Sequence, residues 1–223
     1  VPEKWVIPLP NNLTLLNSMS LGTAGLTAGA CVKKIIDASS SLNNPILVSG
    51  ATGGVGSVAV NLLSKLDFEV HAITGKPNET EILKKMGASE IIDRHKFMAD
   101  PVKPLDKAIY SAGIDTVGGD ILSKMLSMIS SHGSVACCGN VGGMKFTSSV
   151  FPFILRGVSL IGIDSAESDI DFKKQIWSLF SGNWSLNLDE YSKVVQLADI
   201  ENEIKAMLNG DQIGRVVIKH GDL

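Results

Sequence analysis

The sequence predicts an α/β fold, a doubly wound parallel sheet of the Rossmann type, and three observations support this prediction. Short apolar runs alternate with segments of helical spacing between Pro45 and Ser165. The first of these runs leads into a glycine-rich turn and then into an apolar helical stripe. The chain has 223 residues, of which 44% are hydrophobic and 19% charged, enough for a sizeable core. Strands alternating with helices at this spacing form βαβ units with right-handed crossovers.

The expected elements follow in order along the chain. An extended lead-in precedes a helix over residues 19–36, which has small residues on its early turns. Strands are expected at 46–49, 69–74, 91–92, 108–117, 134–138 and 158–163, with helices at 55–66, 79–86 and 118–130 between them. After Ser165 the alternation stops, and two helices (171–180 and 199–208) and a terminal strand (215–219) are expected.

Composition excludes several classes of function. The formal net charge is -3, and no run of basic residues interleaved with aromatics indicates nucleic acid. The longest apolar stretch, 151–163, is interrupted by Arg156 and is too short to span a membrane. The three cysteines, Cys31, Cys137 and Cys138, form no disulfide framework, and no histidine lies within four residues of one. We therefore expect a cytoplasmic protein with no bound metal, no membrane and no nucleic-acid partner.

The turn from Gly50 to Gly56 is the strongest motif. It joins the first strand to its helix and aligns with the dinucleotide fingerprint G-x-G-x-x-G, with Ala51 in place of the first glycine. Glycine permits the tight turn and a close approach of backbone N–H groups to phosphate oxygens. The start of the helix adds unpaired N–H groups and the positive end of a dipole. The turn therefore predicts dinucleotide binding, with the pyrophosphate at Thr52, Gly53, Gly54 and Val55; a purely structural turn is the alternative.

The same turn can be aligned as glycines at every third position, the spacing of short-chain dehydrogenases. Those enzymes need a tyrosine and a lysine four residues apart. Tyr110 is followed at that distance by Ile114, and Tyr191 by Val195, so neither tyrosine fits. We set the short-chain family aside on this ground.

The end of the second strand favours NADP over NAD. An acidic residue about twenty positions after the fingerprint would hold the ribose hydroxyls of NAD. The sequence has Thr74, Gly75 and Lys76 there instead, and Arg94 follows the third strand. A hydroxyl, a free backbone and two cations suit a 2′-phosphate, although either cation alone would be interpreted as an ordinary surface charge.

Several motifs together resemble the medium-chain dehydrogenase/reductases. More narrowly, they resemble the zinc-independent quinone oxidoreductase/acryloyl-CoA reductase branch. In chain order these motifs are residues 21–28, 50–56, 87–88, 114–119, 151–158, 162–165 and 214–216. The segment Phe153-Ile154-Leu155-Arg156 with Ile163-Asp164-Ser165 is the most specific of them.

The resemblance implies NADP(H) as cofactor and a role for further residues. Asn140, Ile154 and Ser165 would lie along the nicotinamide, and a residue near Asp211 or Gln212 would close the pocket. Ile154 and Ser165 have a second interpretation as ordinary sheet and loop residues. Relatives commonly have an apolar residue at Asn140, so that assignment stays open.

The resemblance also implies a domain organisation. Residues 1–18 would end a GroES-like catalytic domain that is mostly absent, 19–165 would be the NADP-binding domain, and 166–223 would return to the catalytic domain. The implied reaction is hydride transfer to a quinone or to an alkene conjugated to a carbonyl, such as an enone or an acyl-CoA, with no convincing catalytic residue in this chain. The alternative is a non-catalytic NADPH-binding or dimerisation module. The apolar strand 158–163 predicts a homodimer formed along an open sheet edge.

Overall fold

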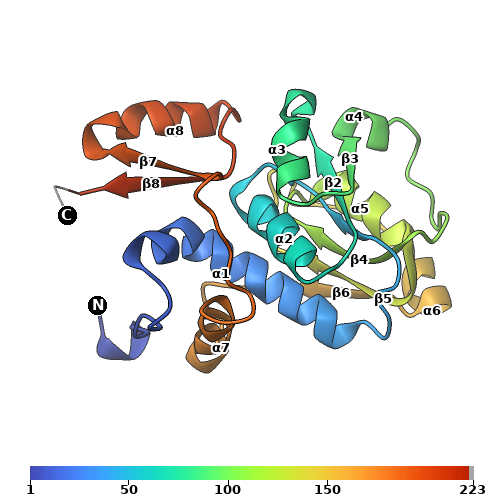
Figure 1. Cartoon of the computed structure of the whole chain (residues 1–223). Coiled ribbons are helices and arrows are strands. Elements are labelled where there is room, and N and C mark those ends of the chain that lie inside the picture. The colour runs from blue at the N-terminus through green and yellow to red at the C-terminus, as the bar shows by residue number, and fades with distance from the viewer. Residues whose placement is uncertain (221–223) are drawn as a thin grey trace.

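A computed structural model describes residues 1–220, and its main sheet has six parallel strands (Figure 1). Their spatial order is β3-β2-β1-β4-β5-β6. The strands are β1 (Ile46–Val48), β2 (Val70–Thr74), β3 (Glu90–Asp93), β4 (Tyr110–Asp115), β5 (Ile129–Cys137) and β6 (Ser159–Gly162). The order reverses between β1 and β4, which is the topological switch point where Rossmann folds bind their ligands. The predicted fold class is confirmed.

Helices cover both faces of this sheet. They are α1 (Leu15–Ala38), α2 (Gly54–Lys65), α3 (Thr80–Lys85), α4 (Arg94–Phe97), α5 (Gly119–Ser127), α6 (Phe151–Arg156) and α7 (Ile170–Phe180). A further helix, α8 (Ile200–Leu208), lies outside this sheet. Short 3-10 turns lie at Glu3–Trp5, Pro77–Glu79 and Leu197–Asp199. Among the described helices, none is long and apolar enough to cross a membrane.

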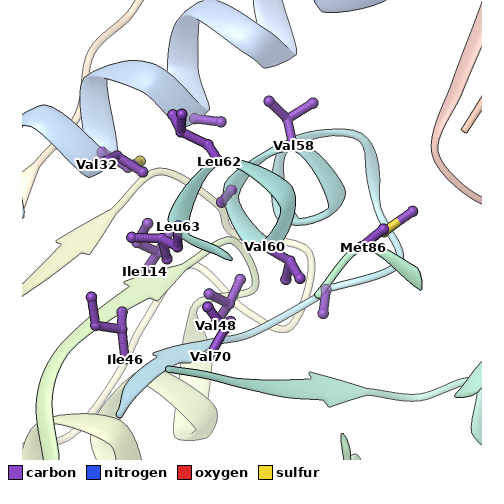
Figure 2. Packing of buried hydrophobic residues seen from close by; sticks show 14 of the residues in the cluster. Val32, Ile46, Val48, Val58, Val60, Leu62, Leu63, Val70, Met86 and Ile114 are labelled. Atoms are coloured by element: carbon purple, nitrogen blue, oxygen red, sulfur yellow. The ribbon is translucent and has the colours of Figure 1, made fainter. Parts of the chain in front are cut away.

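The two faces have separate cores because successive strand residues point to opposite sides. Ile46 and Val48 pack with α1, α2 and α7 on one face, whereas Leu47 packs with α4 and α5 on the other. Figure 2 shows the first core, with Leu62 and Leu63 of α2 lying over the strands. Each fully buried side chain of this size stabilises the fold by roughly 1.5–3 kcal/mol, so these layers hold the carboxyl ends of the strands in place.

Helix α1 begins at Leu15, four residues before the expected start. Thr14 caps it, because its Oγ1 accepts a hydrogen bond from Asn17 N at 3.0 Å. The helix is interrupted at Gly22, whose φ of 50° and ψ of -152° are not helical. The small residues on the early turns therefore mark a kink, which the sequence alone did not indicate.

Other boundaries also differ from the sequence-based expectation. The helix expected over 118–130 ends at Ser127, and Ile129 already begins β5. Residues 151–156, part of an apolar stretch, form the short helix α6. An unexpected strand, β7 (Ser192–Gln196), pairs in parallel with β8 (Arg215–Lys219). Three of the five β7 residues are exposed, so this strand lacks the apolar run that signalled the others.

Helix α7 packs directly against α1. An added Cβ at Gly29 of α1 would lie 2.7 Å from Ile176 Cγ2 and 2.9 Å from Phe180 Cε2. Both side chains belong to the same core as β1. By contrast, β7, α8 and β8 form a small separate layer beside the start of α1 (Figure 1). The proposed division into 1–18, 19–165 and 166–223 remains a prediction about the whole protein.

Candidate functional site

The phosphate turn lies at the carboxyl end of β1, next to the switch point. Gly50 has a φ of 61°, and a Cβ there would lie 2.3 Å from Thr116 Oγ1. A Cβ at Gly56 would lie 2.2 Å from the Gly50 carbonyl oxygen. Ala51 is fully buried, and its N–H donates to Ile73 O at 3.0 Å, so the alanine fits where the fingerprint has its first glycine. Gly53 caps α2, whose first N–H groups have no partner within the helix.

A second group of candidate residues lies at the ends of β2 and β3. Thr74 Oγ1 is 3.4 Å from Thr52 Oγ1 and accepts a hydrogen bond from Lys76 N at 3.0 Å. A Cβ at Gly75 would lie 3.0 Å from Arg94 Cζ, so the Arg94 guanidinium lies against this backbone. The structure therefore brings Thr52, Thr74, Gly75, Lys76 and Arg94 together beside the phosphate turn.

The C-terminal segment reaches the same place. Lys76 Nζ donates a hydrogen bond to the Gln212 carbonyl oxygen, and the carboxylate of Asp211 attracts the lysine's positive charge. Burial lowers the pKa of Lys76, while the negative charges of Asp211 and Glu79 act to raise it. The loop at residues 211–212, predicted to lie beside the cofactor pocket, thus contacts Lys76.

Asp93, the acidic residue next to Arg94 in the sequence, forms its hydrogen bond with the backbone of α4. Asp93 ends β3, and its carboxylate accepts a hydrogen bond from Lys96 N at 2.9 Å, which caps α4. This bond from the Lys96 N–H is the main reason that the pKa of Asp93 is lowered. Arg94 itself is exposed.

The proposed nicotinamide end lies at the carboxyl ends of β4, β5 and β6. A cavity of about 530 Å³ opens there, lined by Cys137, Cys138, Gly139, Asn140, Gly162, Ile163 and Asp164. Asn140 is exposed in the loop that follows β5. Ser165 lies just beyond Asp164, and its Oγ accepts a hydrogen bond from Thr27 Oγ1 of α1 at 2.7 Å.

Two glycine-rich loops interlock beneath this cavity. A Cβ at Gly139 would lie 1.9 Å from Thr116 O, and one at Gly119 would lie 2.6 Å from Gly142 O. Gly142 N donates to Val117 O at 2.7 Å. The loop carrying Asn140 is therefore held directly by the loop that ends β4.

Asp115, the last residue of β4, organises both loops. It is fully buried, and Oδ1 accepts from Ser49 Oγ at 2.6 Å and from Val117 N at 3.2 Å. Its Oδ2 accepts from Gly118 N at 2.8 Å and lies 3.6 Å from the Cys137 thiol. Because Ser49 immediately precedes the phosphate turn, this carboxylate joins the turn to the nicotinamide-end loops.

Two cysteines line the cavity, and their thiols differ. Burial, reinforced by the nearby charge of Asp115, raises the pKa of Cys137 to about 11, so this thiol is protonated at neutral pH. A hydrogen bond with the Cys31 thiol, which is fully buried in the α1 core, lowers the pKa of Cys138.

Ile154 is the candidate that the structure does not bring to this edge. It lies on α6 with its side chain 69% exposed. The same helix ends at the opposite end of β5, where Arg156 Nη1 donates to Ile129 O at 3.1 Å and to Ser127 O at 2.9 Å. Arg156, which interrupts the apolar stretch 151–163 in the sequence, therefore binds backbone carbonyls.

One residue at the site was not assigned from the sequence. Arg215 begins β8, and Gly214 N donates to Thr52 O at 3.0 Å, which brings the arginine beside the phosphate turn. A Cβ at Gly54 would lie 2.7 Å from Arg215 Nη1. The motif at 214–216 marked this segment, but nothing in the sequence indicated that it folds back over the start of α2.

Comparison with known proteins identifies the family. The family model described as zinc-binding dehydrogenase matches residues 54–182. The putative quinone oxidoreductase YhfP of Bacillus subtilis is 39% identical over 98% of this chain and 67% of its own length. The probable acrylyl-CoA reductase AcuI of Escherichia coli is 36% identical over 98% of this chain and 68% of its own. The chain belongs to the medium-chain dehydrogenase/reductases.

Solved structures of this family agree with the fold. The yhdH oxidoreductase of Salmonella enterica, in complex with NADP, superposes with a TM-score of 0.94 at 35% identity, covering 98% of this chain and 68% of that one. B. subtilis yhfP with NAD bound gives a TM-score of 0.95 at 39% identity, covering 99% and 68%. The medium-chain dehydrogenase/reductase chain described here thus spans about two thirds of the length of these relatives.

Although the family is described as zinc-binding, this part of the chain presents no set of zinc ligands. Over residues 1–220, no group of three His, Cys, Asp or Glu side chains is arranged to hold a metal ion. The narrower branch of quinone oxidoreductases and acrylyl-CoA reductases, to which the relatives named above belong, matches the resemblance found in the sequence.

Proposed function

We propose that this chain binds NADP(H) and forms the cofactor-binding portion of a reductase acting on quinones or on alkenes conjugated to a carbonyl. The observation that carries the proposal is the arrangement at the switch point. A turn that has no room for a Cβ at Gly50 or Gly56 lies beside Lys76 and Arg94. Two of the structures compared were solved with nicotinamide dinucleotides.

The residues fit such a dinucleotide part by part. The N–H groups of Gly54 and Val55 would take the pyrophosphate, since they begin a twelve-residue helix and have no acceptor within it. Thr52 and Gly53 would border it, although Gly53 N already donates to Gly50 O at 2.9 Å. Thr74, Gly75, Lys76 and Arg94 would take the adenosine 2′-phosphate, with Asp211 bordering Lys76. No carboxylate ends β2, where an NAD-specific fold would carry one.

The nicotinamide would extend toward Asn140 and Ser165. When bound, it supplies the hydride. The chain's own contribution would be to orient the ring: Ser165 is fixed by Thr27, and the Asn140 loop is fixed by Asp115 through Gly118. The contact of Ile154 with the nicotinamide stays a prediction. Ile154 is exposed on α6, so such a contact would involve another part of the protein.

The relatives' names, quinone oxidoreductase and acrylyl-CoA reductase, support the substrate class. In both reactions negative charge develops on an oxygen, which needs hydrogen-bond donors nearby. Described donors that border the cavity include the Asn140 amide.

Consumption of reduced nicotinamide tests the proposal against the alternative of a non-catalytic NADPH-binding module. The full reading frame that encodes this chain is assayed with a benzoquinone, an enal and acryloyl-CoA, each against a saturated analogue. We expect NADPH oxidation that requires the quinone or the conjugated alkene. Tight NADPH binding with no turnover on any of the three would favour the module instead.

A homodimer is the second part of the proposal. β6 is an edge strand of the main sheet. Ile163 N donates inward to Cys137 O at 2.9 Å, so the alternate N–H groups along β6 face outward and are free to pair with a second copy.

A further inference from the structure

Two thiols meet where α1 packs against the end of β5, beside the cavity at the proposed nicotinamide end. Cys138 directly follows β5, lines the cavity and is half-buried. Cys31 of α1 is fully buried in the core against which Cys138 packs. The two thiols form a hydrogen bond with each other. The pair therefore joins a thiol sealed in the core to a thiol at the cavity wall.

Solvation decides which of these two thiols loses its proton first. A thiolate is costly in a fully buried position, so the charge is better placed on Cys138, which borders the cavity. The Cys31 thiol then remains a hydrogen-bond donor to the Cys138 thiolate. This bond lowers the pKa of Cys138, against the opposing effects of burial and of the Asp115 charge, and raises the pKa of Cys31.

Cys137, the neighbour of Cys138 in the chain, is placed in the opposite way. Successive strand residues point to opposite faces, and Cys137 packs on the α4 and α5 side of the sheet. Its Sγ lies 3.6 Å from Asp115 Oδ2, a charged oxygen, whereas Cys138 Sγ lies 3.5 Å from Asp115 O, a neutral carbonyl. The carboxylate favours the protonated thiol at Cys137. Because both residues line the same cavity, Cys137 is an internal reference for the reactivity of Cys138.

We infer that Cys138 is a modification site for compounds with an alkene conjugated to a carbonyl, quinones included, and that Cys31 is the positioning residue beside it. The thiolate is the reactive form of a cysteine, and the cavity gives such a compound access to it. The choice of electrophile rests on the proposed function, because the same compounds are the substrates proposed for this cavity. A substrate that enters while no reduced nicotinamide is bound would meet the Cys138 thiol instead of a hydride.

The reaction is a conjugate addition, and its atoms and charges balance. The Cys138 sulfur forms a bond to the alkene carbon β to the carbonyl, and the π bond of the alkene breaks. The electron pair of that bond moves onto the carbonyl oxygen, which becomes an enolate. The α carbon then takes a proton from water, which replaces the proton that the thiol released. The product is a thioether, and no outside oxidant or reductant takes part.

The experiment treats the full chain with N-ethylmaleimide and, separately, with acrolein, and locates the adducts by peptide mass spectrometry. Borohydride fixes the acrolein adduct before digestion, and propanal, the saturated analogue, should leave the cysteines unmodified. We expect Cys138 to react about tenfold faster than Cys137 or more, and Cys31 to stay unmodified. In urea all three cysteines should react, which shows that the digest recovers each of them.

Two variants of Cys31 separate its positioning role from simple packing. Cys31→Ser keeps a hydrogen-bond donor beside Cys138, so the alkylation rate should match that of the wild type. Cys31→Ala removes the donor, and the rate should fall about 2- to 4-fold, because greater nucleophilicity offsets part of the lost thiolate. Cys137→Ser is the matched control on the same cavity wall and should leave the Cys138 rate unchanged. Thermal unfolding confirms that each variant is folded.

The outcomes distinguish the inference from the proposed function. Equal alkylation of Cys137 and Cys138, or an unreactive Cys138 in the folded chain, would overturn the inference while the proposed function stands. A Cys31→Ala rate equal to the Cys31→Ser rate would overturn the role of Cys31. Excess oxidised NADP should slow the alkylation of Cys138, because the nicotinamide is proposed to lie at the same cavity. Selective alkylation that NADP does not slow would support the modification site and contradict the proposed position of the nicotinamide.

Discussion

The buried carboxylate of Asp115 offers the sharpest test of how the site is held together. Each of its oxygens faces only donors: Ser49 Oγ and Val117 N on Oδ1, Gly118 N and the Cys137 thiol on Oδ2. The variant Asp115→Asn keeps one oxygen and replaces the other by an NH₂ group. Whichever way the amide turns, that NH₂ group must face hydrogen-bond donors.

The cost follows from these contacts. With the amide oxygen toward Ser49, Gly118 N loses its acceptor and the new NH₂ group has none. An unsatisfied buried donor costs about 1–3 kcal/mol, and here there are two. We therefore expect a loss of about 2–6 kcal/mol in the free energy of unfolding, or a fall in melting temperature of about 4–24 °C for a domain of this size.

Urea unfolding followed by circular dichroism measures this loss, with the m-value compared to confirm that both proteins unfold in the same way. Asp164→Asn is the matched control. Asp164 is exposed and uses a single oxygen, Oδ1, to accept from Ala166 N and Glu167 N at 3.0 Å, which an asparagine can reproduce. Its expected change is within about 0.5 kcal/mol. A loss below about 1 kcal/mol at Asp115 would refute the structural role assigned to this carboxylate.

Two further predictions concern glycines. Gly56→Ala places a Cβ 2.2 Å from a backbone oxygen that cannot move independently, so we expect a loss of about 1–3 kcal/mol and weaker NADPH binding, measured by urea unfolding and titration. Gly182→Ala, whose Cβ would meet its nearest atom at 3.6 Å, should be nearly neutral; equal effects at both positions would contradict the geometry. Gly162→Pro should convert a dimer to a monomer of 23.6 kDa in sedimentation, because it removes an outward N–H of β6. A wild-type chain that sediments as a monomer would exclude the edge-strand dimer.

The sequence predicted the elements of this fold best where a periodic apolar pattern or a tight turn requires particular residue types. β1, the phosphate turn and α2 follow from an apolar run, four glycines and an apolar stripe. The absence of a carboxylate after Thr74 was also visible in the sequence. The structure then brought Lys76 and Arg94 beside the turn because the parallel strands β2 and β3 end at the same edge.

Contacts between distant segments were not visible in the sequence. Arg215 lies 161 positions from Gly54, and no local pattern indicates that β8 returns to the start of α2. The role of Asp115 was not visible either, because a buried carboxylate and an exposed one look alike in sequence. The partly exposed strand β7 was missed for the related reason that its neighbour β8, rather than an apolar core, stabilises it.

The central claim is that the end of β2 selects the 2′-phosphate of NADP(H). Its most direct test is calorimetric titration of this chain and of Lys76→Glu with NADPH and NADH. Lys65→Glu, the same charge reversal at an exposed lysine that ends α2, roughly 17 Å along the helix from its first residue, is the control. We predict tighter binding of NADPH than of NADH by the wild type and the control, and a narrowed difference for Lys76→Glu. Equal or tighter binding of NADH by the wild-type chain would contradict the claim.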